Sequence, residues 1–137
     1  MIVADANLIA YFVMPGERTE EAERVFQADP AWVAPVLWAS EMRSVLLGQL
    51  RAKTISASQA ERLMDRAEQV IAGRVGEPRS ARVLELALKS GCSSYDCEYV
   101  ALAEELGVPL ISSDGKLAKA FPKVVQSPAE FAAGSNP

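Results

Sequence analysis

Histidine is absent from this chain of 137 residues. Its absence excludes Ser-His-Asp and Cys-His triads, RNA cleavage by paired histidines, and zinc sites built on histidine. If the chain is an enzyme, acids, hydroxyl groups or metal ions must therefore carry its chemistry.

Cysteine is scarce, and so are long apolar runs. Cys92 and Cys97 are too few and too close for a disulfide framework, and they lack the CxxC spacing of a redox or zinc site, so we expect two reduced thiols without a role. No apolar run reaches the length of about 18 residues that a membrane span needs, and the first residues do not resemble a signal peptide. We therefore expect a cytoplasmic protein that does not contact a membrane.

The chain also lacks a basic excess. Its 14 basic and 18 acidic residues give a net charge of −4, which argues against binding nucleic acid by general electrostatics. The argument weakens if four of the acids gather on metal ions, because the remaining charge is then zero. Half of the residues are hydrophobic, enough for the core of a single domain.

Short apolar runs alternate with segments of helical periodicity, which is typical of an α/β fold. We expect one domain over residues 1–131 and a disordered tail over 132–137. The expected strands are 2–4, 32–34, 74–77, 108–112 and 123–125. The expected helices are 19–28, 36–53, 56–72, 78–90, 93–106 and 116–120, with a final helical turn that begins near 127.

Two acids end predicted strands. Asp5 follows Ile2-Val3-Ala4, and Asp114 ends the run PLISSD. In an open parallel sheet the carboxyl ends of the strands lie at one edge, where ligands bind. If these two strands are neighbours, two carboxylates meet with no basic residue beside them, which requires a cation or a raised pKa. Oxygen donors without histidine suit Mg²⁺ or Mn²⁺.

Two further acids share the apolar face of a predicted helix. Glu41 has Leu37 and Trp38 one turn before it and Val45 one turn after it. Asp96 has apolar residues three, four and seven positions later, whereas nearby glutamates take the opposite face. Both acids are expected to point toward the body of the protein.

Each of these acids also has an ordinary structural explanation. Asp5 can cap a short helix that begins two residues later, and Asp114 can open an Asp-Gly turn. Asp96 can complete a capping box with Ser93, and Glu41 can pair with an arginine or reach solvent. The residues alone leave these alternatives open.

Four stretches of the chain resemble the PIN domain, and most closely the VapC-type toxins of bacterial toxin–antitoxin pairs. They are IVADANLIAY, ASEMRSVL, SSYDCEYVALAEELGVPLISSDGKL and VVQSPAEF, and the resemblance extends from about residue 2 to residue 131. It implies a three-layer α/β/α sandwich around a five-stranded parallel sheet whose first and fourth strands are neighbours.

The resemblance also implies a set of site residues. Asp5, Glu41, Asp96 and Asp114 match the acidic quartet that is catalytic and binds the metal, and supporting polar positions match Asn7, Ser93 and Ser112. The family more often has threonine at the two serine positions, so both are departures that keep the hydroxyl group.

The implied activity is that of a Mg²⁺- or Mn²⁺-dependent endoribonuclease. A water activated by the metal would attack the phosphodiester and leave 5′-phosphate and 3′-hydroxyl ends. The implied partners are an RNA substrate, a small VapB-like antitoxin and a second copy in a homodimer. The alternative is a catalytically inactive PIN domain that binds proteins. A phosphoacceptor receiver domain is disfavoured, because Asp5 stands alone where that class has paired acids.

Two sets of surface residues belong to these hypotheses. Contacts to the RNA backbone would come from Arg43, Arg51, Lys53, Lys116 and Lys119, or from the second group Arg74, Arg79 and Arg82. An interface with the antitoxin or the second copy would use Leu37, Trp38, Leu46, Leu47 and Leu50, which otherwise belong to the core.

Overall fold

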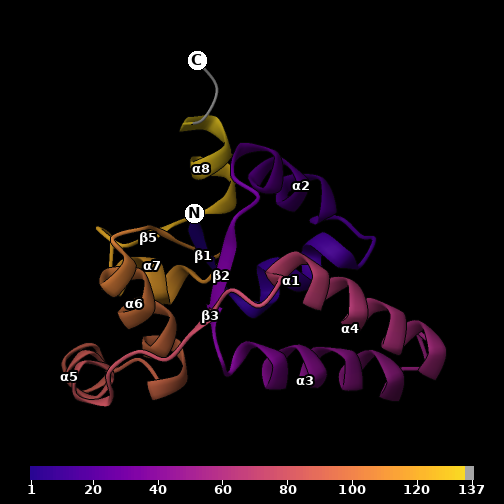
Figure 1. The fold of residues 1–137 in the computed structure, drawn as a ribbon, viewed down its shortest axis with the longest axis horizontal. Helices are drawn as coiled ribbons and strands as arrows, with labels where there is room; N and C mark the ends of the chain where they lie inside the picture. Colours follow the sequence, from indigo (N-terminus) through magenta and orange to yellow (C-terminus); the bar gives the residue numbers. More distant parts are fainter. Residues whose placement is uncertain (135–137) are drawn as a thin grey trace.

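A parallel five-stranded sheet, in the order β3-β2-β1-β4-β5, forms the centre of the molecule (Figure 1). The structure is a computed structural model and describes residues 1–134. The strands are β1 (Ile2–Ala4), β2 (Trp32–Pro35), β3 (Val75–Gly76), β4 (Leu110–Ile111) and β5 (Val125–Gln126). The fold class and the five parallel strands predicted from the sequence are confirmed.

Helices cover both faces of the sheet and complete the three-layer α/β/α sandwich. They are α1 (Ala6–Val13), α2 (Thr19–Ala28), α3 (Trp38–Arg51), α4 (Ala57–Ile71), α5 (Ser80–Ser90), α6 (Ser94–Leu106), α7 (Gly115–Ala120) and α8 (Pro128–Gly134). Figure 1 shows α1, α3 and α4 on one side of the strands and α5 and α6 on the other. Helix α6 packs on β1, β2 and β4, and α4 packs on β2.

The strands at the centre of the sheet are apolar because both of their faces are covered. The three residues of β1 are at most 1% exposed, and Trp32 at the start of β2 is fully buried. The ring of Trp32 packs edge-on against Phe12 and Phe26, and its Nε1 donates to the carbonyl of Asp29 at 2.8 Å. This core fixes the strand ends where the candidate site lies.

Helix α1 is missing from the elements that the sequence predicts. Its residues Leu8, Ile9 and Ala10 are all buried, so the segment lacks the polar face that marks a surface helix. From the sequence, a helix at this position was considered only as part of the alternative in which Asp5 is a helix cap. The helical hairpin of α3 and α4 is present, with ends within two residues of those expected.

Arg74 ties α4 to the sheet through backbone carbonyls. Its guanidinium donates to Trp32 at 2.9 Å, to Val70 at 2.7 Å and to Pro30 at 3.3 Å. This arginine, considered from the sequence as a phosphate contact, therefore has a structural role.

The C-terminal helix extends into the segment expected to be a tail. Helix α8 ends at Gly134, so it includes residues 132–134, and residues 135–137 of that expectation lie outside the described residues. Within residues 1–134, no helix is long and apolar enough to cross a membrane.

Candidate functional site

The sheet register brings the first and last acids of the quartet to one edge. Strands β1 and β4 are parallel neighbours, with Ala4 opposite Ile111. The next residues are Asp5 and Ser112, and Asp114 follows two positions later. The adjacency on which the strand-end prediction depended is confirmed.

Asp5 and Asp114 both cap helices. Oδ1 of Asp5 accepts the backbone N–H of Leu8 at 2.8 Å at the start of α1, and Oδ1 of Asp114 accepts that of Leu117 at 3.1 Å at the start of α7. The cap considered for Asp5 is therefore present, whereas Asp114, considered as the start of an Asp-Gly turn, instead caps α7, which begins at Gly115. A carboxylate has about four acceptor sites, so a cap of this kind leaves it able to bind a further ligand.

Ser112 connects the same two acids. Its side chain is 1% exposed, and its Oγ accepts the backbone N–H of Asp114 at 3.1 Å. Its hydroxyl also forms a hydrogen bond with the carboxylate of Asp5. A buried hydroxyl thus holds the ends of β1 and β4 in a fixed relation.

The sequence left two alternatives for Glu41, an ion pair with an arginine or a side chain that reaches solvent. The structure shows neither of these as its main contact. Glu41 lies in the first turn of α3, half-buried, and its Oε1 accepts the hydroxyl of Tyr99 at 2.6 Å. Tyr99 belongs to α6 and is 3% exposed. The glutamate therefore faces inward, as its helical position predicted.

Asp96 lies in the first turn of α6, where Ser93 is the N-cap. The Oγ of Ser93 accepts the backbone N–H of Asp96 at 3.0 Å. Within residues 1–134 the carboxylate of Asp96 has no hydrogen bond or ion pair, so the expected capping box is only half formed. This carboxylate is free for a ligand.

All four acids line one cavity of about 460 Å³, which we call the acid pocket. Its wall consists of Asp5, Ala6, Asn7, Leu37, Ser40, Glu41, Ser44, Val45, Tyr95, Asp96, Tyr99, Ser112, Asp114 and Leu117. Of the supporting residues expected from the sequence, Asn7 and Ser112 line the pocket, whereas Ser93 acts one step away as a helix cap. No lysine or arginine is among these described lining residues.

Burial, with a smaller contribution from neighbouring acids, raises the pKa of two carboxyl groups in the pocket. Burial raises the pKa of Asp5 to about 6, the bonds from Ser112 and Leu8 partly offset this, and Glu41 and Asp114 add repulsion. Burial likewise raises the pKa of Glu41; the Tyr99 hydrogen bond lowers it, and Asp96 and Glu98 raise it. A bound cation would relieve this repulsion.

The donor set fits a hard cation. No three acidic or cysteine side chains among residues 1–134 are grouped closely enough to form a ready-made metal site. Mg²⁺, however, keeps several of its waters and takes one or two carboxylates directly, so acids spread around a hydrated cavity suit it. The chemistry of the pocket therefore agrees with the expected Mg²⁺ or Mn²⁺.

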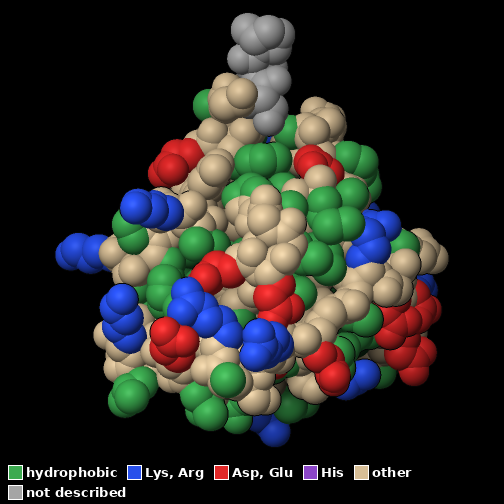
Figure 2. Space-filling model, turned by 60° about the vertical axis from the view of Figure 1, so that its left-hand side comes forward, with side chains coloured by type: hydrophobic (Ala, Val, Ile, Leu, Met, Phe, Trp, Pro, Cys, Tyr) green, Lys and Arg blue, Asp and Glu red, His purple; other side chains and the backbone are tan. Residues whose placement is uncertain are grey.

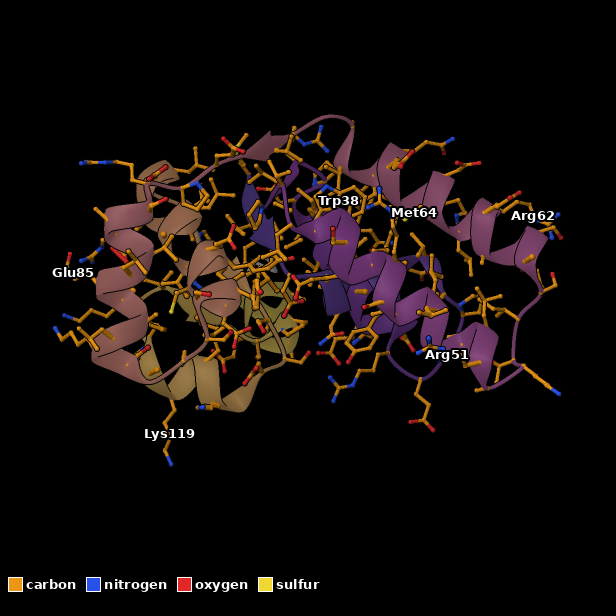
Figure 3. The ribbon with its side chains drawn as sticks, turned by 90° about the horizontal axis from the view of Figure 1, so that it is seen from below. Trp38, Arg51, Arg62, Met64, Glu85 and Lys119 are labelled. Carbon is orange, nitrogen blue, oxygen red and sulfur yellow. The ribbon has the colours of Figure 1, made fainter. Side chains whose placement is uncertain are left out.

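The basic residues are interspersed with acids on the surface. Figure 2 shows both signs of charge mixed on one face of the molecule. Arg43 and Lys116 are exposed and lie two residues after acids of the pocket. Arg51 lies at the far end of α3, and Lys119 projects outward from α7 (Figure 3). In the second basic group, Arg82 is paired with Glu104 at 2.6 Å.

The apolar residues of α3 divide between core and surface. Trp38 and Leu46 are each 5% exposed, so both belong to the core. Leu37 lines the acid pocket, and Leu47 is 42% exposed. Both cysteines are buried free thiols, as expected.

Sequence reasoning missed several residues of the pocket. Tyr95, Tyr99, Ser40 and Ser44 line it, but none was a candidate. Tyr99 was noted only as an apolar neighbour of Asp96, because a tyrosine on a buried face is usually a core residue. The signal available was its spacing, three residues after an inward acid.

Comparisons with known proteins agree on one family. The family "PIN domain" matches residues 2–121. Ribonuclease VapC3 of Pyrobaculum aerophilum is 33% identical over 128 residues, which cover 90% of this chain and 97% of the relative. Ribonuclease VapC1 of Mycobacterium tuberculosis is 36% identical over 89 residues, covering 64% of this chain and 65% of the relative.

Two solved structures have the same fold. PAE2754 from Pyrobaculum aerophilum has a TM-score of 0.78 at 18% identity, with 98% of this chain and 95% of that chain covered. FitAcB from Neisseria gonorrhoeae has a TM-score of 0.71 at 19% identity, with 94% and 99% covered.

Proposed function

The chain belongs to the PIN-domain family, among its VapC-type ribonucleases, and from this premise we propose that it is a metal-dependent endoribonuclease. The observation that carries the proposal is the convergence of Asp5, Glu41, Asp96 and Asp114 on one cavity that no basic side chain among the described residues lines. Structural roles alone do not account for Glu41 and Asp96, whose carboxylates cap no helix.

The four acids would hold Mg²⁺ or Mn²⁺. When bound, the ion supplies a water of lowered pKa and positive charge against the phosphate oxygens. Asp96 contributes a carboxylate without another partner, and Asp5 and Asp114 contribute carboxylates whose orientation is fixed by the α1 and α7 caps. The ion is held on side chains that the fold has already oriented, which limits the entropy lost on binding.

Asp5 and Glu41 have different places in the proposed site. Asp5 lies at the end of β1, and Ser112 lies at the end of the neighbouring strand β4, so both line the pocket from the sheet. Glu41 faces it from α3 and orients the attacking water, because one of its oxygens is already fixed by Tyr99. The apolar side chains of Leu37 and Leu117 border the acids and limit the access of bulk water.

The pocket also offers contacts for a single nucleic acid strand. Tyr95 lines it with 61% of its surface exposed, and its ring is available for stacking with a base. Lys116 is exposed two residues after Asp114 and can contact a phosphate of the RNA backbone. A site that stacks an unpaired base and binds the phosphate beside it favours single-stranded or looped RNA. Proteins usually recognise RNA sequence in this form.

The experiment is a cleavage assay on purified protein free of any partner. A labelled single-stranded RNA, a structured RNA and the matching DNA are incubated with Mn²⁺ or Mg²⁺. Controls contain EDTA or the Asp96→Asn variant, which retains the shape of the side chain. We expect RNA cleavage by wild type only, and only with metal, leaving 5′-phosphate ends.

Other outcomes would contradict the proposal. Equal cleavage in EDTA, or by Asp96→Asn, would point to a contaminating nuclease or to chemistry outside the pocket. A folded wild type that binds metal yet cleaves none of the substrates would favour the alternative, an inactive PIN domain that binds proteins.

We also propose the partners expected of this class, a small antitoxin and a second copy of the chain. The similarity to VapC-named relatives supports the antitoxin, and the exposed Leu47 on α3 gives apolar surface for either partner. Light scattering on the purified chain tests the dimer. Loss of cleavage on adding an equimolar candidate antitoxin tests the other interaction.

A further inference from the structure

One buried hydroxyl joins two walls of the acid pocket. The pocket lies between α3, which carries Glu41, and α6, which carries Asp96 and Tyr99. The Tyr99 hydroxyl donates to Oε1 of Glu41 at 2.6 Å, across 58 positions of sequence. Among the side-chain hydrogen bonds and ion pairs found in residues 1–134, it is the one that links these two helices.

The two helices otherwise belong to different parts of the fold. Helix α3 packs on α1 and α4, whereas α6 packs on α5 and on strands β1, β2 and β4. Figure 3, seen from below, shows α3 beginning at Trp38 and running toward Arg51, away from α5, which carries Glu85. The Tyr99–Glu41 bond is therefore a direct link between the two walls of the pocket.

The side chain of Glu41 needs a bond that keeps its carboxylate turned toward the pocket. Its side chain has three rotatable bonds, and two nearby acids, Asp96 and Glu98, repel its charge. Burial also disfavours the charged form, which raises the pKa of Glu41. Without an opposing bond, the carboxylate would turn out of the pocket toward water. The Tyr99 hydrogen bond opposes both effects, because it favours the charged form and holds it in place.

We propose that Tyr99 is a positioning residue, whose hydroxyl holds the Glu41 carboxylate toward the cavity with one oxygen fixed and the other available to a divalent cation or its water. The inference rests on the proposed function, since it assigns a role within the same metal site. Tyr99 acts through Glu41 and touches neither the cation nor the substrate. Partners that orient metal ligands in this way typically contribute about 10- to 100-fold in affinity.

Calorimetric titration with Mn²⁺ alone tests this role without any substrate. Tyr99→Phe keeps the buried ring and removes only the hydroxyl. We expect its affinity for Mn²⁺ to fall by about 10-fold or more. Tyr11→Phe is the matched control: it loses the same group from α1, outside the pocket, and is expected to bind as wild type does.

Repeating the Tyr99→Phe substitution in a Glu41→Ala variant shows whether Tyr99 acts by orienting Glu41 or only by packing in the core. In Glu41→Ala the hydroxyl has no carboxylate to hold, so adding Tyr99→Phe should change the Mn²⁺ affinity by no more than about twofold, as expected for a residue that acts through its partner. Glu41→Asp tests the role without altering Tyr99. It keeps the charge but shortens the side chain by one methylene group, so it should weaken Mn²⁺ binding as Tyr99→Phe does.

The outcomes distinguish this inference from the proposed function. If wild type binds no Mn²⁺, the metal-dependent function fails, and the positioning role fails with it. If wild type binds and both Tyr99→Phe and Glu41→Asp bind equally well, only the positioning role is refuted. An equal loss from Tyr99→Phe in the wild-type and Glu41→Ala backgrounds would also refute it, because the effect would not pass through Glu41.

Discussion

Replacing Asp5 by asparagine should inactivate the protein and, without metal, stabilise it. Asparagine keeps an oxygen that can accept the N–H of Leu8, so the cap of α1 survives. The substitution removes a charge that is buried and repelled by Glu41 and Asp114. Most substitutions at buried positions destabilise, so a gain in stability would be a specific sign of charge strain.

The size of the gain follows from the pKa. A rise from 3.8 to about 6 is a shift of roughly two units, which at about 1.4 kcal/mol per unit destabilises the charged folded state by about 3 kcal/mol. Loss of the favourable negative charge at the start of α1 destabilises the variant by about 0.3–1 kcal/mol, which offsets part of this gain. The net gain at pH 7.5 is then about 2 kcal/mol, or roughly 6 °C in Tm for a chain of this size.

The pH dependence has a definite sign. Between about pH 4 and pH 6 the unfolded chain has already lost this proton, whereas the folded chain still holds it. Wild type therefore loses stability as the pH rises through this window, and the penalty is complete above it. The difference between Asp5→Asn and wild type should be near zero or slightly negative at pH 4 and reach its full size by about pH 7.

Urea unfolding in EDTA, followed by circular dichroism from pH 4 to pH 8, measures this difference. Adding Mn²⁺ should stabilise wild type and leave Asp5→Asn much less affected, because ligands stabilise only the state that binds them. A variant that is destabilised by 1 kcal/mol or more at pH 7.5, or a difference that does not change with pH, would refute the reasoning. Asp5 would then be a structural cap and nothing more.

Three other substitutions test other parts of the structure. Tyr95→Ala should weaken single-stranded RNA binding by about 1–3 kcal/mol in a fluorescence anisotropy assay; Leu88→Ala, a control at a 90% exposed residue of α5, should not. Arg74→Ala should lower the free energy of unfolding by about 2–4 kcal/mol in urea, because the hydrogen bonds from its guanidinium to the carbonyls of Trp32, Pro30 and Val70 are lost. Ser112→Ala should raise the pKa of Asp5 further and cost about 1–3 kcal/mol at neutral pH, whereas Ser112→Thr should cost less.

Much of the fold was predictable, because the central strands β1, β2 and β4 are short apolar runs between clear helix signals. Glycine and serine mark the helix ends: Ser56 caps α4, and Gly91 and Gly107 adopt the left-handed conformation after α5 and α6. Such signals are local. Helix α1 was missed because it is buried on most sides and has no polar face.

The candidate site was predictable only in part. Asp5 and Asp114 could be found because each follows a strand, but their proximity depends on the pairing of β1 with β4, which no local pattern encodes. The link between Tyr99 and Glu41 spans 58 positions, and it depends on where two helices end up on the sheet. The sequence alone could suggest the chemical groups, but not which of them share a hydrogen bond.

The helical hairpin of α3 and α4 extends away from the sheet, and Glu41 is the fourth residue of α3. At about 1.5 Å per residue, the 14-residue helix is about 21 Å long and Glu41 lies about 5 Å from its base. A tilt of about 5° at the base moves the tip by about 2 Å but Glu41 by only about 0.4 Å. The tip of the hairpin can therefore move while the end next to the acid pocket stays almost still. A partner that bound only the tip of the hairpin could bend it with little movement of Glu41, so binding there alone would leave the acids in place.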